Sequence, residues 1–343
     1  MGMEQKRLFN EKGERGTSAL IGGNTTNIRE WNRIKYNWAH QLYRLMLNNF
    51  WIPEEISLNQ DVSQFPTLTG SERRAFDKVI SFLNFLDSIQ CENIPHIADY
   101  VTAPEVVSLL NIQTFQEEVH AQSYSYILDT VCSPETRNAI YDEWRTDPVL
   151  FERNKFIADE YQTFVDYPSE ENFVHTLMAD YLLEAIYFYN GFAFFYSLAR
   201  NGKMTMTATL IKYIHRDEET HVALFSNMIH ELKKERPTLF NEKMVNYLEE
   251  MMATAVEHEI AWGKHFAQNE LLGMTDEVIE RYIRYLSNQR MKSLGFRELY
   301  PEVKEHPMQW VESFKNINQT KTDFFEQKVT SYTKSSGLDF SDL

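Results

Sequence analysis

FQEEVHAQSY (residues 115–124) and IHRDEETHVAL (residues 214–224) share one arrangement of side chains. In each stretch a Glu precedes a His by three residues, and residues three apart lie on the same face of a helix. A single pair of this kind is weak evidence, because Glu–His contacts also occur on protein surfaces. Two copies on helical segments are typical of a helical bundle that binds two metal ions, which also takes one carboxylate from each of two other helices.

Two further acids stand in strongly apolar surroundings. Asp87 lies within VISFLNFLDSIQC (79–91), and Glu184 lies within YLLEAIYFYNGFAFF (181–195). Burial of a lone charge is costly, so each acid should be neutralised, paired or bound to a metal. For Asp87 a hydrogen-bonded acid or an acid at a helix end is an equally good interpretation. For Glu184 the fifteen uncharged residues that follow it argue against simple solvation.

The four segments together supply a complete set of ligands for two metal ions. The six candidates are Asp87, Glu117, His120, Glu184, Glu218 and His221. Oxygen and nitrogen ligands without thiolate suit iron or manganese. Two divalent ions would cancel the charge of four carboxylates, which allows the site to be buried. The neighbouring Glu118 and Glu219 point about 100° away on a helix and are not expected to be ligands.

The composition indicates a helical protein without nucleic-acid or membrane partners. Lys and Arg total 34 against 50 Asp and Glu, and the charge of -16 argues against binding to nucleic acid or anionic lipid. The chain has only 12 Gly and 10 Pro, so turns should be few and helices long. The longest uncharged stretch, 185–199, falls short of the roughly 20 residues that span a bilayer. Two cysteines and no secretory signal suggest a cytoplasmic protein with free thiols.

Helical periodicity extends along most of the chain, and no alternating strand pattern of useful length is present. Helices are expected over 25–51, 70–91, 104–130, 134–145, 148–166, 169–200, 203–235, 238–271 and 275–294. The stretch 51–70 should be a loop, and Pro95 should break the helix that precedes it. We therefore predict an all-α protein with a mobile segment at 1–24, a single helical domain at 25–330 and a flexible tail at 331–343.

Tyr124 is a candidate for redox chemistry. It follows Glu117 by seven residues and His120 by four, so all three share one helix face. A phenol beside an oxygen-activating metal pair can be oxidised to a radical, although an ordinary core tyrosine is a fair alternative in a chain with 18 tyrosines. Three apolar residues at helical spacing from Glu184 and Glu218 should form a dry cage around this interior. They are Phe188, Phe192 and Ile214.

With these residues in place, the chain resembles the small, radical-generating subunit of class I ribonucleotide reductase. The resemblance runs from about Asn27 to the C-terminus. Its motifs, in order, are FWIPEEI (50–56), LDSIQ (86–90), EEVHAQSY (117–124), LEAIYFY (183–189) and IHRDEETH (214–221). It implies a ferritin-like bundle with additional helices and a homodimer. It further implies that one metal is bound by Asp87, Glu117 and His120, and the other by Glu184, Glu218 and His221, with at least one bridging carboxylate.

The resemblance also implies a path for the radical. Tyr124 matches the radical tyrosine, and Trp51 matches the tryptophan that relays an electron toward the metals. Asp217 matches the acid that links this tryptophan to His120. Tyr332 matches the tail tyrosine that passes the radical to the large subunit, and the final residues would dock that subunit. Only 11 residues follow Tyr332, a shorter tail than many family members have.

The activity implied is that of a ribonucleoside-diphosphate reductase, in which the large subunit reduces the nucleotide. Iron and manganese both remain open, as do diphosphate and triphosphate substrates. Gly191 is typical of the manganese-using branch, where a flavodoxin-like activator supplies superoxide; close helix packing explains this glycine equally well. Two rival interpretations are a ferritin-like di-metal oxidase acting on a lipid or hydrocarbon and an iron-storage or structural bundle. Neither rival requires Trp51, Asp217 and a tail tyrosine.

Overall fold

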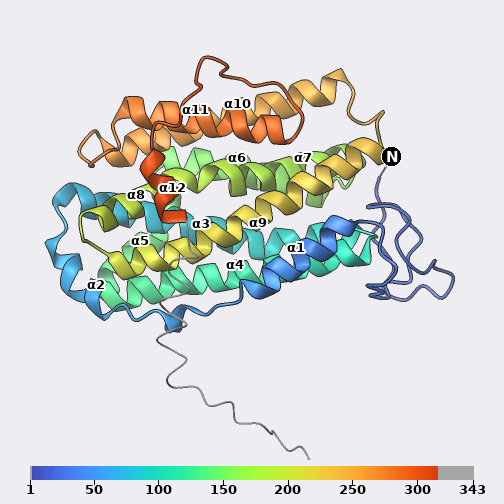
Figure 1. The fold of residues 1–343 in the computed structure, drawn as a ribbon, viewed down its shortest axis with the longest axis horizontal. Coiled ribbons are helices and arrows are strands. Elements are labelled where there is room, and N and C mark those ends of the chain that lie inside the picture. The colour runs from blue at the N-terminus through green and yellow to red at the C-terminus, as the bar shows by residue number, and fades with distance from the viewer. Residues whose placement is uncertain (1, 316–343) are drawn as a thin grey trace, which may run out of the picture.

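The computed structural model describes residues 2–315, which fold into a bundle of long helices (Figure 1). The elements are α1 (Asn37–Asn48), η1 (Pro53–Glu55), α2 (Asn59–Gln64), η2 (Phe65–Thr67), α3 (Gly70–Tyr100), α4 (Pro104–Val131), α5 (Pro134–Thr146), α6 (Pro148–Asp166), α7 (Glu170–Leu182), η3 (Leu183–Tyr187), α8 (Tyr189–Arg200), α9 (Thr205–Glu235), α10 (Glu242–Ala267), α11 (Asp276–Ser293) and α12 (Gln309–Lys315). Between residues 2 and 315 the only β-type pairings are isolated bridges. The prediction of an all-α fold is confirmed.

Local sequence signals place most helix starts. Thr69 and the Glu three residues later form a capping box at the start of α3. Proline occupies the first turn of α4, α5 and α6, where its missing N–H costs nothing. Ser133 and Asp147 accept hydrogen bonds from the first turns of α5 and α6. The predicted bounds of these three helices are therefore confirmed to within a residue at each end.

The long helix α4 packs against both α3 and α9 in the body of the molecule, while α10 and α11 cover one side (Figure 1). Apolar residues at spacings of three and four turn one face of α3 inward. Val79, Ile80, Leu83 and Leu86 are all fully buried. Full burial of each such side chain contributes about 1.5–3 kcal/mol. This packing fixes the position of Asp87, the next residue along the chain.

The first helix begins at Asn37 rather than at residue 25, so that part of the prediction is wrong. Asn27 has a φ of +63°, which is incompatible with a right-handed helix. Just before α1, the carboxylate of Glu105 accepts hydrogen bonds from the backbone N–H groups of Lys35 and Tyr36 at 3.0 and 3.3 Å. A side chain from α4 therefore fixes the start of α1, and short-range periodicity does not show it.

The prediction that Pro95 breaks a helix is also wrong. Helix α3 continues through this residue and ends at Tyr100, nine residues beyond the predicted end. A proline inside a helix removes one backbone hydrogen bond. Ile94 and Ile97 on either side are fully buried, so tertiary packing outweighs the local cost. The loop predicted over 51–70 is likewise corrected, because it contains η1, α2 and η2.

The helix predicted over 169–200 is interrupted by η3, a π-helical segment at Leu183–Tyr187. Single π-helical turns occur frequently at functional sites, and this one contains Glu184. Further along, a Cβ atom at Gly191 would lie 3.0 Å from the Phe82 ring and 3.2 Å from a methyl carbon of Val79. This supports the interpretation that Gly191 permits close packing of α8 on α3.

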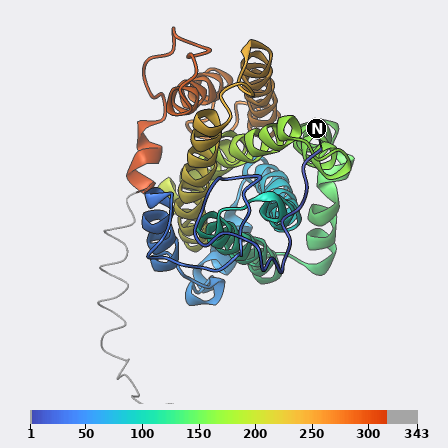
Figure 2. The same cartoon turned by 90° about the vertical axis from the view of Figure 1, so that its right-hand side faces the viewer.

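Residues 2–36 form irregular loops over one end of the bundle (Figure 2). Leu20 and Ile21 are buried there, and Leu20 accepts a backbone hydrogen bond from Thr102 at 2.8 Å. Near the start of the chain, the Met3 N–H donates to the carbonyl of Pro168 at 2.8 Å. The segment is thus tied to the connection between α3 and α4 and to the connection between α6 and α7. Its mobility stays a prediction.

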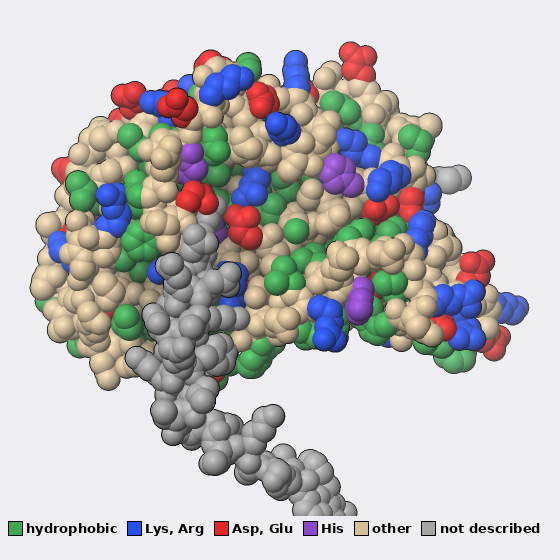
Figure 3. All heavy atoms as spheres, in the orientation of Figure 1, with side chains coloured by type: hydrophobic (Ala, Val, Ile, Leu, Met, Phe, Trp, Pro, Cys, Tyr) green, Lys and Arg blue, Asp and Glu red, His purple; other side chains and the backbone are tan. Residues whose placement is uncertain are grey.

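Acidic and basic side chains are mingled on the face seen in Figure 3. Exposed helix positions also carry ion pairs, such as Lys155 with Asp159 one turn away. No helix within residues 2–315 combines the length and the apolar character that a membrane span requires.

Candidate metal centre

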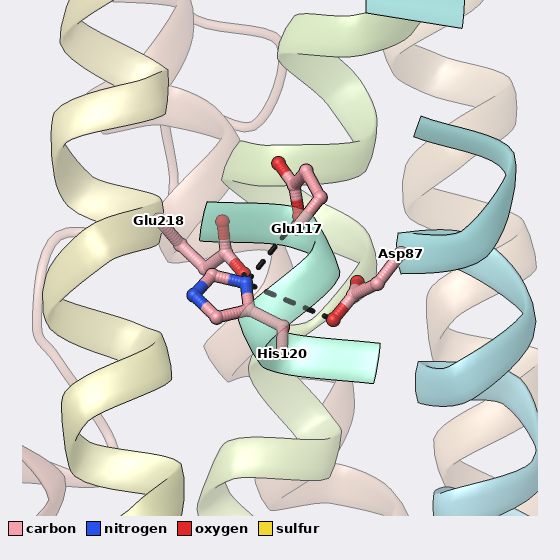
Figure 4. A group of neighbouring side chains, drawn as sticks. All are labelled: Asp87, Glu117, His120 and Glu218. Atoms are coloured by element: carbon pink, nitrogen blue, oxygen red, sulfur yellow. Dashed lines mark ion pairs between the residues drawn. The ribbon is translucent and has the colours of Figure 1, made fainter. Parts of the chain in front are cut away.

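Six side chains from four separate parts of the chain converge in the core. Asp87 comes from α3, Glu117 and His120 from α4, Glu184 from η3, and Glu218 and His221 from α9. They form two groups, each able to hold one metal ion, with the candidate ligand atoms of a group within 4.8 Å of one another. Figure 4 shows four of them pointing toward one another from α3, α4 and α9. All six are fully buried.

His120 is at the centre of the first group. Its Nδ1 atom lies 3.1 Å from Oε1 of Glu218 and 3.3 Å from Oε2 of Glu117. Oδ2 of Asp87 is 3.8 Å from the same nitrogen. One ring nitrogen therefore faces three carboxylates, which is the arrangement of a metal site of mixed nitrogen and oxygen ligands.

His221 has the same place in the second group. Its Nδ1 atom lies 2.6 Å from Oε2 of Glu218 and 3.1 Å from Oε1 of Glu117. Oε2 of Glu184 is 3.5 Å away. Glu117 and Glu218 thus present one oxygen to each imidazole, whereas Asp87 and Glu184 each belong to one group only. The geometry identifies Glu117 and Glu218 as the carboxylates able to bridge two ions.

Hydrogen bonding within the cluster is incomplete. Several of its buried atoms have no hydrogen-bond partner among the described residues: both oxygens of Asp87, Oε2 of Glu117, Oε2 of Glu184, Oε1 of Glu218 and both ring nitrogens of His120. An unsatisfied buried polar group costs about 1–3 kcal/mol, and more when it is charged. Two divalent ions would supply the missing partners and cancel the four negative charges. The donor set therefore fits a dinuclear site of iron or manganese.

Protons take up part of the excess negative charge when no metal is bound. Burial, reinforced by the neighbouring carboxylates, raises the pKa of Asp87 and of Glu184 well above the ordinary values. Burial opposes the charged form of His120 and His221 too, but the surrounding carboxylates outweigh it and raise the pKa of both imidazoles. Binding of metal must therefore displace protons from this cluster.

A chain of side chains leads outward from His120. The Trp51 Nε1–H donates to Oδ2 of Asp217 at 2.7 Å, and the same oxygen lies 3.6 Å from Nε2 of His120. The Trp51 and His120 rings are stacked with their centroids 6.2 Å apart. Arg216 holds the other oxygen of Asp217 through two hydrogen bonds of 3.1 Å. The structure thus brings the predicted trio of Trp51, Asp217 and His120 together.

Tyr124 is fully buried, and its hydroxyl has no hydrogen-bond partner among the described residues. Burial and the nearby carboxylate of Asp87 raise the pKa of its phenol well above the usual value. The three residues of the predicted cage, Phe188, Phe192 and Ile214, are fully buried as well. Phe192 stacks on His215 with the ring centroids 4.5 Å apart. The role of these three residues around a radical stays a prediction.

Three glutamines around the cluster were not predicted. Oε1 of Glu184 accepts hydrogen bonds from Gln90 at 2.8 Å and from Gln113 at 2.9 Å. Oε1 of Gln116 lies 3.0 Å from Nε2 of His221. Because a glutamine carbonyl accepts, Nε2 carries the ring proton and Nδ1 is left for the metal. The positions of Gln113 and Gln116, four and one residues before Glu117, were the available signals.

The residues excluded by helix geometry lie outside the cluster as expected. Glu118 is exposed, and Glu219 accepts a hydrogen bond of 2.7 Å from Tyr189 and another of 3.2 Å from Arg290. Tyr332 and the tail around it fall outside the described residues, so the proposed tail function is not placed by the structure.

A helical bundle with two buried Glu-x-x-His helices, two further carboxylates and no thiolate in the cluster belongs to the class of dinuclear carboxylate proteins. Comparison with known proteins shows which family within this class the chain resembles. The sequence model for the small chain of ribonucleotide reductase matches residues 28–307. The chain belongs to this family of ribonucleotide reductase small subunits.

Individual relatives agree over nearly the full length. The ribonucleoside-diphosphate reductase subunit beta of Treponema pallidum is 46% identical, with 98% of this chain and 97% of that protein aligned. The corresponding subunit of Halalkalibacterium halodurans is 40% identical over 97% and 96% of the two chains. The solved ribonucleotide reductase R2 subunit from Clostridium botulinum is 62% identical and superimposes with a TM-score of 0.90, covering 92% of this chain and 99% of that one.

Proposed function

We propose that this chain generates a radical on Tyr124 and passes it to a large subunit that reduces ribonucleoside diphosphates. The observation that carries the proposal is the Trp51–Asp217 hydrogen bond of 2.7 Å, set directly behind His120. A metal-storage bundle or a di-metal oxidase acting on a lipid or hydrocarbon does not need an indole coupled to a metal ligand in this way. The relatives' names, ribonucleoside-diphosphate reductase subunit beta, support this substrate class.

In this proposal the six clustered residues are the metal ligands. Asp87, Glu117 and His120 bind one ion, Glu184, Glu218 and His221 bind the other, and Glu117 and Glu218 are placed to bridge. When bound, the pair of iron or manganese ions supplies the oxidising equivalent obtained from oxygen or superoxide. A flavodoxin-like activator would be the source of superoxide for a manganese pair.

Tyr124 is the residue that stores the oxidising equivalent. Its phenol loses one electron and the hydroxyl proton, and Asp87, the carboxylate that acts most strongly on the Tyr124 pKa, would be the acceptor of that proton. Full burial of Tyr124, Phe188, Phe192 and Ile214 excludes the water and reductants that would quench the radical.

Trp51, Asp217 and Tyr332 carry the radical out of the core. Asp217 accepts the indole proton at 2.7 Å, so Trp51 can give up an electron while its N–H proton shifts along the hydrogen bond. Tyr332 then hands the radical to the large subunit, which the residues after it would dock. We further propose a homodimer that works in the cytoplasm.

The radical on Tyr124 is tested by electron paramagnetic resonance. Metal-free protein is loaded with Fe²⁺ and oxygen, or with Mn²⁺ and a source of superoxide. We expect a tyrosyl signal in the native protein and its loss in Tyr124→Phe, while both proteins bind two ions. A Tyr124→Phe protein that keeps an unchanged signal would assign the radical to another residue and contradict the proposal.

The relay is tested with Trp51→Phe, which keeps an aromatic ring but removes the N–H that Asp217 accepts. We expect the tyrosyl signal to persist while nucleotide reduction with the large subunit is lost. Phe50→Leu is the control, because Phe50 is the exposed neighbour of Trp51 and its ring stacks on Phe115. Full turnover by Trp51→Phe would remove Trp51 from the path.

A further inference from the structure

A second buried polar chain leaves the metal centre at Glu184, whereas the chain to Trp51 leaves it at His120. Gln90 of α3 donates from Nε2 to Oε1 of Glu184 at 2.8 Å. Oε1 of the same glutamine lies 2.8 Å from the hydroxyl of Tyr161 in α6. That hydroxyl also lies 2.8 Å from Oδ1 of Asp180 in α7, and Asn93 donates to both Asp180 oxygens at 3.2 Å. These residues are buried, and Gln90 and Asp180 completely so.

The direction of each hydrogen bond in this chain can be worked out. When Glu184 is a carboxylate, the form that binds a metal ion, Gln90 must turn its NH₂ group toward it, because the reverse orientation would set the Gln90 carbonyl against a carboxylate oxygen. Its Oε1 can then only accept, so Tyr161 must donate its single proton to Gln90. The contact between Tyr161 and Asp180 therefore needs a proton from Asp180. The chain is complete only when Asp180 is a neutral carboxylic acid.

We propose that Asp180, Tyr161 and Gln90 form a positioning relay for Glu184, with Asp180 as the proton-bearing end. The relay holds Oε1 of Glu184 and leaves Oε2, which faces His221 at 3.5 Å, free for a metal ion. This inference rests on the metal centre of the proposed function but not on the radical. None of the three residues touches the metal, so each acts through Glu184.

The surroundings of Asp180 favour the neutral acid. The groups that face it are Tyr161 from α6 and the amides of Gln90 and Asn93 from α3, while Glu117 of α4 adds a negative charge at longer range. Burial raises the pKa of Asp180 to about 8 and outweighs the hydrogen bonds with Tyr161, Gln90 and Asn93, which lower it. Burial also raises the pKa of Tyr161 well above its usual value, which keeps the phenol a donor.

Loss of the relay should alter one metal site more than the other. If Tyr161 could not donate, the Gln90 amide would be free to rotate and Gln113 alone would hold Oε1 of Glu184. The site formed by Asp87, Glu117 and His120 has no hydrogen bond to this chain. Changes to residues that orient a ligand typically weaken metal binding by about 10- to 100-fold.

The first experiment titrates metal-free protein with Mn²⁺ alone in a calorimeter. We expect Tyr161→Phe to bind one of two ions about tenfold more weakly and the other with unchanged affinity. Tyr181→Phe is the matched control, because Tyr181 is also fully buried and its hydroxyl bonds to Ser293 and the Arg290 carbonyl, away from the cluster. Equal affinities in native protein and Tyr161→Phe would overturn the proposal.

The second experiment separates a neutral acid from a carboxylate. Asn at position 180 has an NH₂ group that can donate to Tyr161, so Asp180→Asn should keep native Mn²⁺ affinity. Asp180→Leu, similar in volume but unable to donate, should behave like Tyr161→Phe. Equal weakening in Asp180→Asn and Asp180→Leu would show that the carboxylate form is the one required, and would contradict the relay.

Infrared spectroscopy of the metal-loaded protein reads the proton directly. We expect a carbonyl absorption of a protonated carboxylic acid at neutral pH that Asp180→Asn removes and Tyr181→Phe leaves in place. No difference between native protein and Asp180→Asn in this band would overturn the assignment of the proton. The outcomes remain distinct from failure of the proposed function, because native protein that binds fewer than two Mn²⁺ ions would refute the dinuclear site itself.

Discussion

Two adjacent glutamates of α9 differ completely in their surroundings. Glu218 is fully buried and faces Nδ1 of His120 at 3.1 Å and Nδ1 of His221 at 2.6 Å with its two oxygens. Glu219, one residue later, turns to the outer face and bonds to Tyr189 and Arg290. The rotation of about 100° per residue in a helix separates a carboxylate inside the cluster from a half-exposed carboxylate outside it.

This contrast predicts the metal content of two variants. Glu218→Ala removes a carboxylate that belongs to both groups, so we expect the bound Mn²⁺ to fall well below two ions per chain. Glu219→Ala, at the adjacent position, should retain two ions. The measurement is metal analysis after dialysis against a low Mn²⁺ concentration. Two tightly bound ions in Glu218→Ala would contradict the bridging assignment.

The sequence predicted these ligands because their spacing along a helix is a local property. The amides that orient them could not be found in the same way. Gln90 of α3 and Gln113 of α4 donate hydrogen bonds to Glu184 of η3. Gln116 of α4 contacts His221 of α9. Glutamine is also usually a surface residue, so the residue type alone does not indicate a role beside a buried cluster. Contacts between helices depend on packing that a single sequence does not specify.

Asp147 shows how one side chain fixes the start of a helix. It accepts hydrogen bonds from the N–H groups of Val149 and Leu150 at 2.9 and 3.1 Å, at the beginning of α6. It also pairs with Lys78 of α3 at 2.5 Å and with His265 of α10 at 2.7 Å. Burial opposes its ionisation, but the bonds from Lys78 and His265 outweigh burial and lower its pKa to about 2.

Replacement of Asp147 should therefore have two separable effects. Asp147→Ala loses the cap and should reduce the free energy of unfolding by about 1–2 kcal/mol. Asp147→Asn keeps the cap but loses the charge, so its cost should be smaller. Since the folded-state pKa is depressed, the charge contributes above about pH 4 and is lost as the pH falls toward 2. Denaturant unfolding at pH 7 and near pH 3 tests this, and identical losses for both variants at pH 7 would contradict it.

Helix interiors were harder to predict than helix starts. A cap is a single residue whose hydrogen bond is local, and Thr69, Ser133 and Asp147 were all in place to be recognised. The continuation of α3 through Pro95 and the π-helical turn at Leu183–Tyr187 depend on neighbours far away in sequence. The π-helical turn adds a residue to the helix at the position where Glu184 faces the cluster. Periodicity alone predicts an uninterrupted α-helix there.

The candidate metal centre takes its residues from four elements far apart in the chain, namely α3, α4, η3 and α9. Removal of the metals leaves four carboxylates and two imidazoles buried together. Since any ligand that binds only the folded state stabilises it, ions at 100 times the dissociation constant should add about 2.7 kcal/mol for each site. The fold and the site are therefore thermodynamically coupled.

We predict that chelation lowers the melting temperature by several degrees and that added Mn²⁺ restores it. Glu218→Ala should show a much smaller shift, which serves as the control. Because the pKa values of Asp87 and Glu184 are raised, the metal-free cluster retains protons at neutral pH, and Mn²⁺ affinity should fall as the pH is lowered. A melting temperature that is the same with and without metal, at every pH, would contradict the coupling.

Composition and periodicity predicted most of the architecture, because few turn residues and long apolar stripes are typical of long amphipathic helices. They did not predict the N-terminal region, since Glu105 of α4 and not a local cap fixes the start of α1. The paired Glu-x-x-His motifs and the two acids in apolar segments predicted one site from distant helices, and the resemblance added Trp51, Asp217 and Tyr332. The start of α1 depends on a contact with α4, and neither composition nor periodicity could predict that contact.

The complete burial of all six clustered side chains governs how ions exchange with the medium. An ion can enter or leave only when the helices part, so the rates of both events are set by the opening of the bundle and not by diffusion. Such openings are rare in a tightly packed core. We expect exchange to be far slower than turnover, and the ion that arrives first is retained. The metal found in the purified protein would thus record the conditions under which the chain was loaded, and not the relative affinities of the ions.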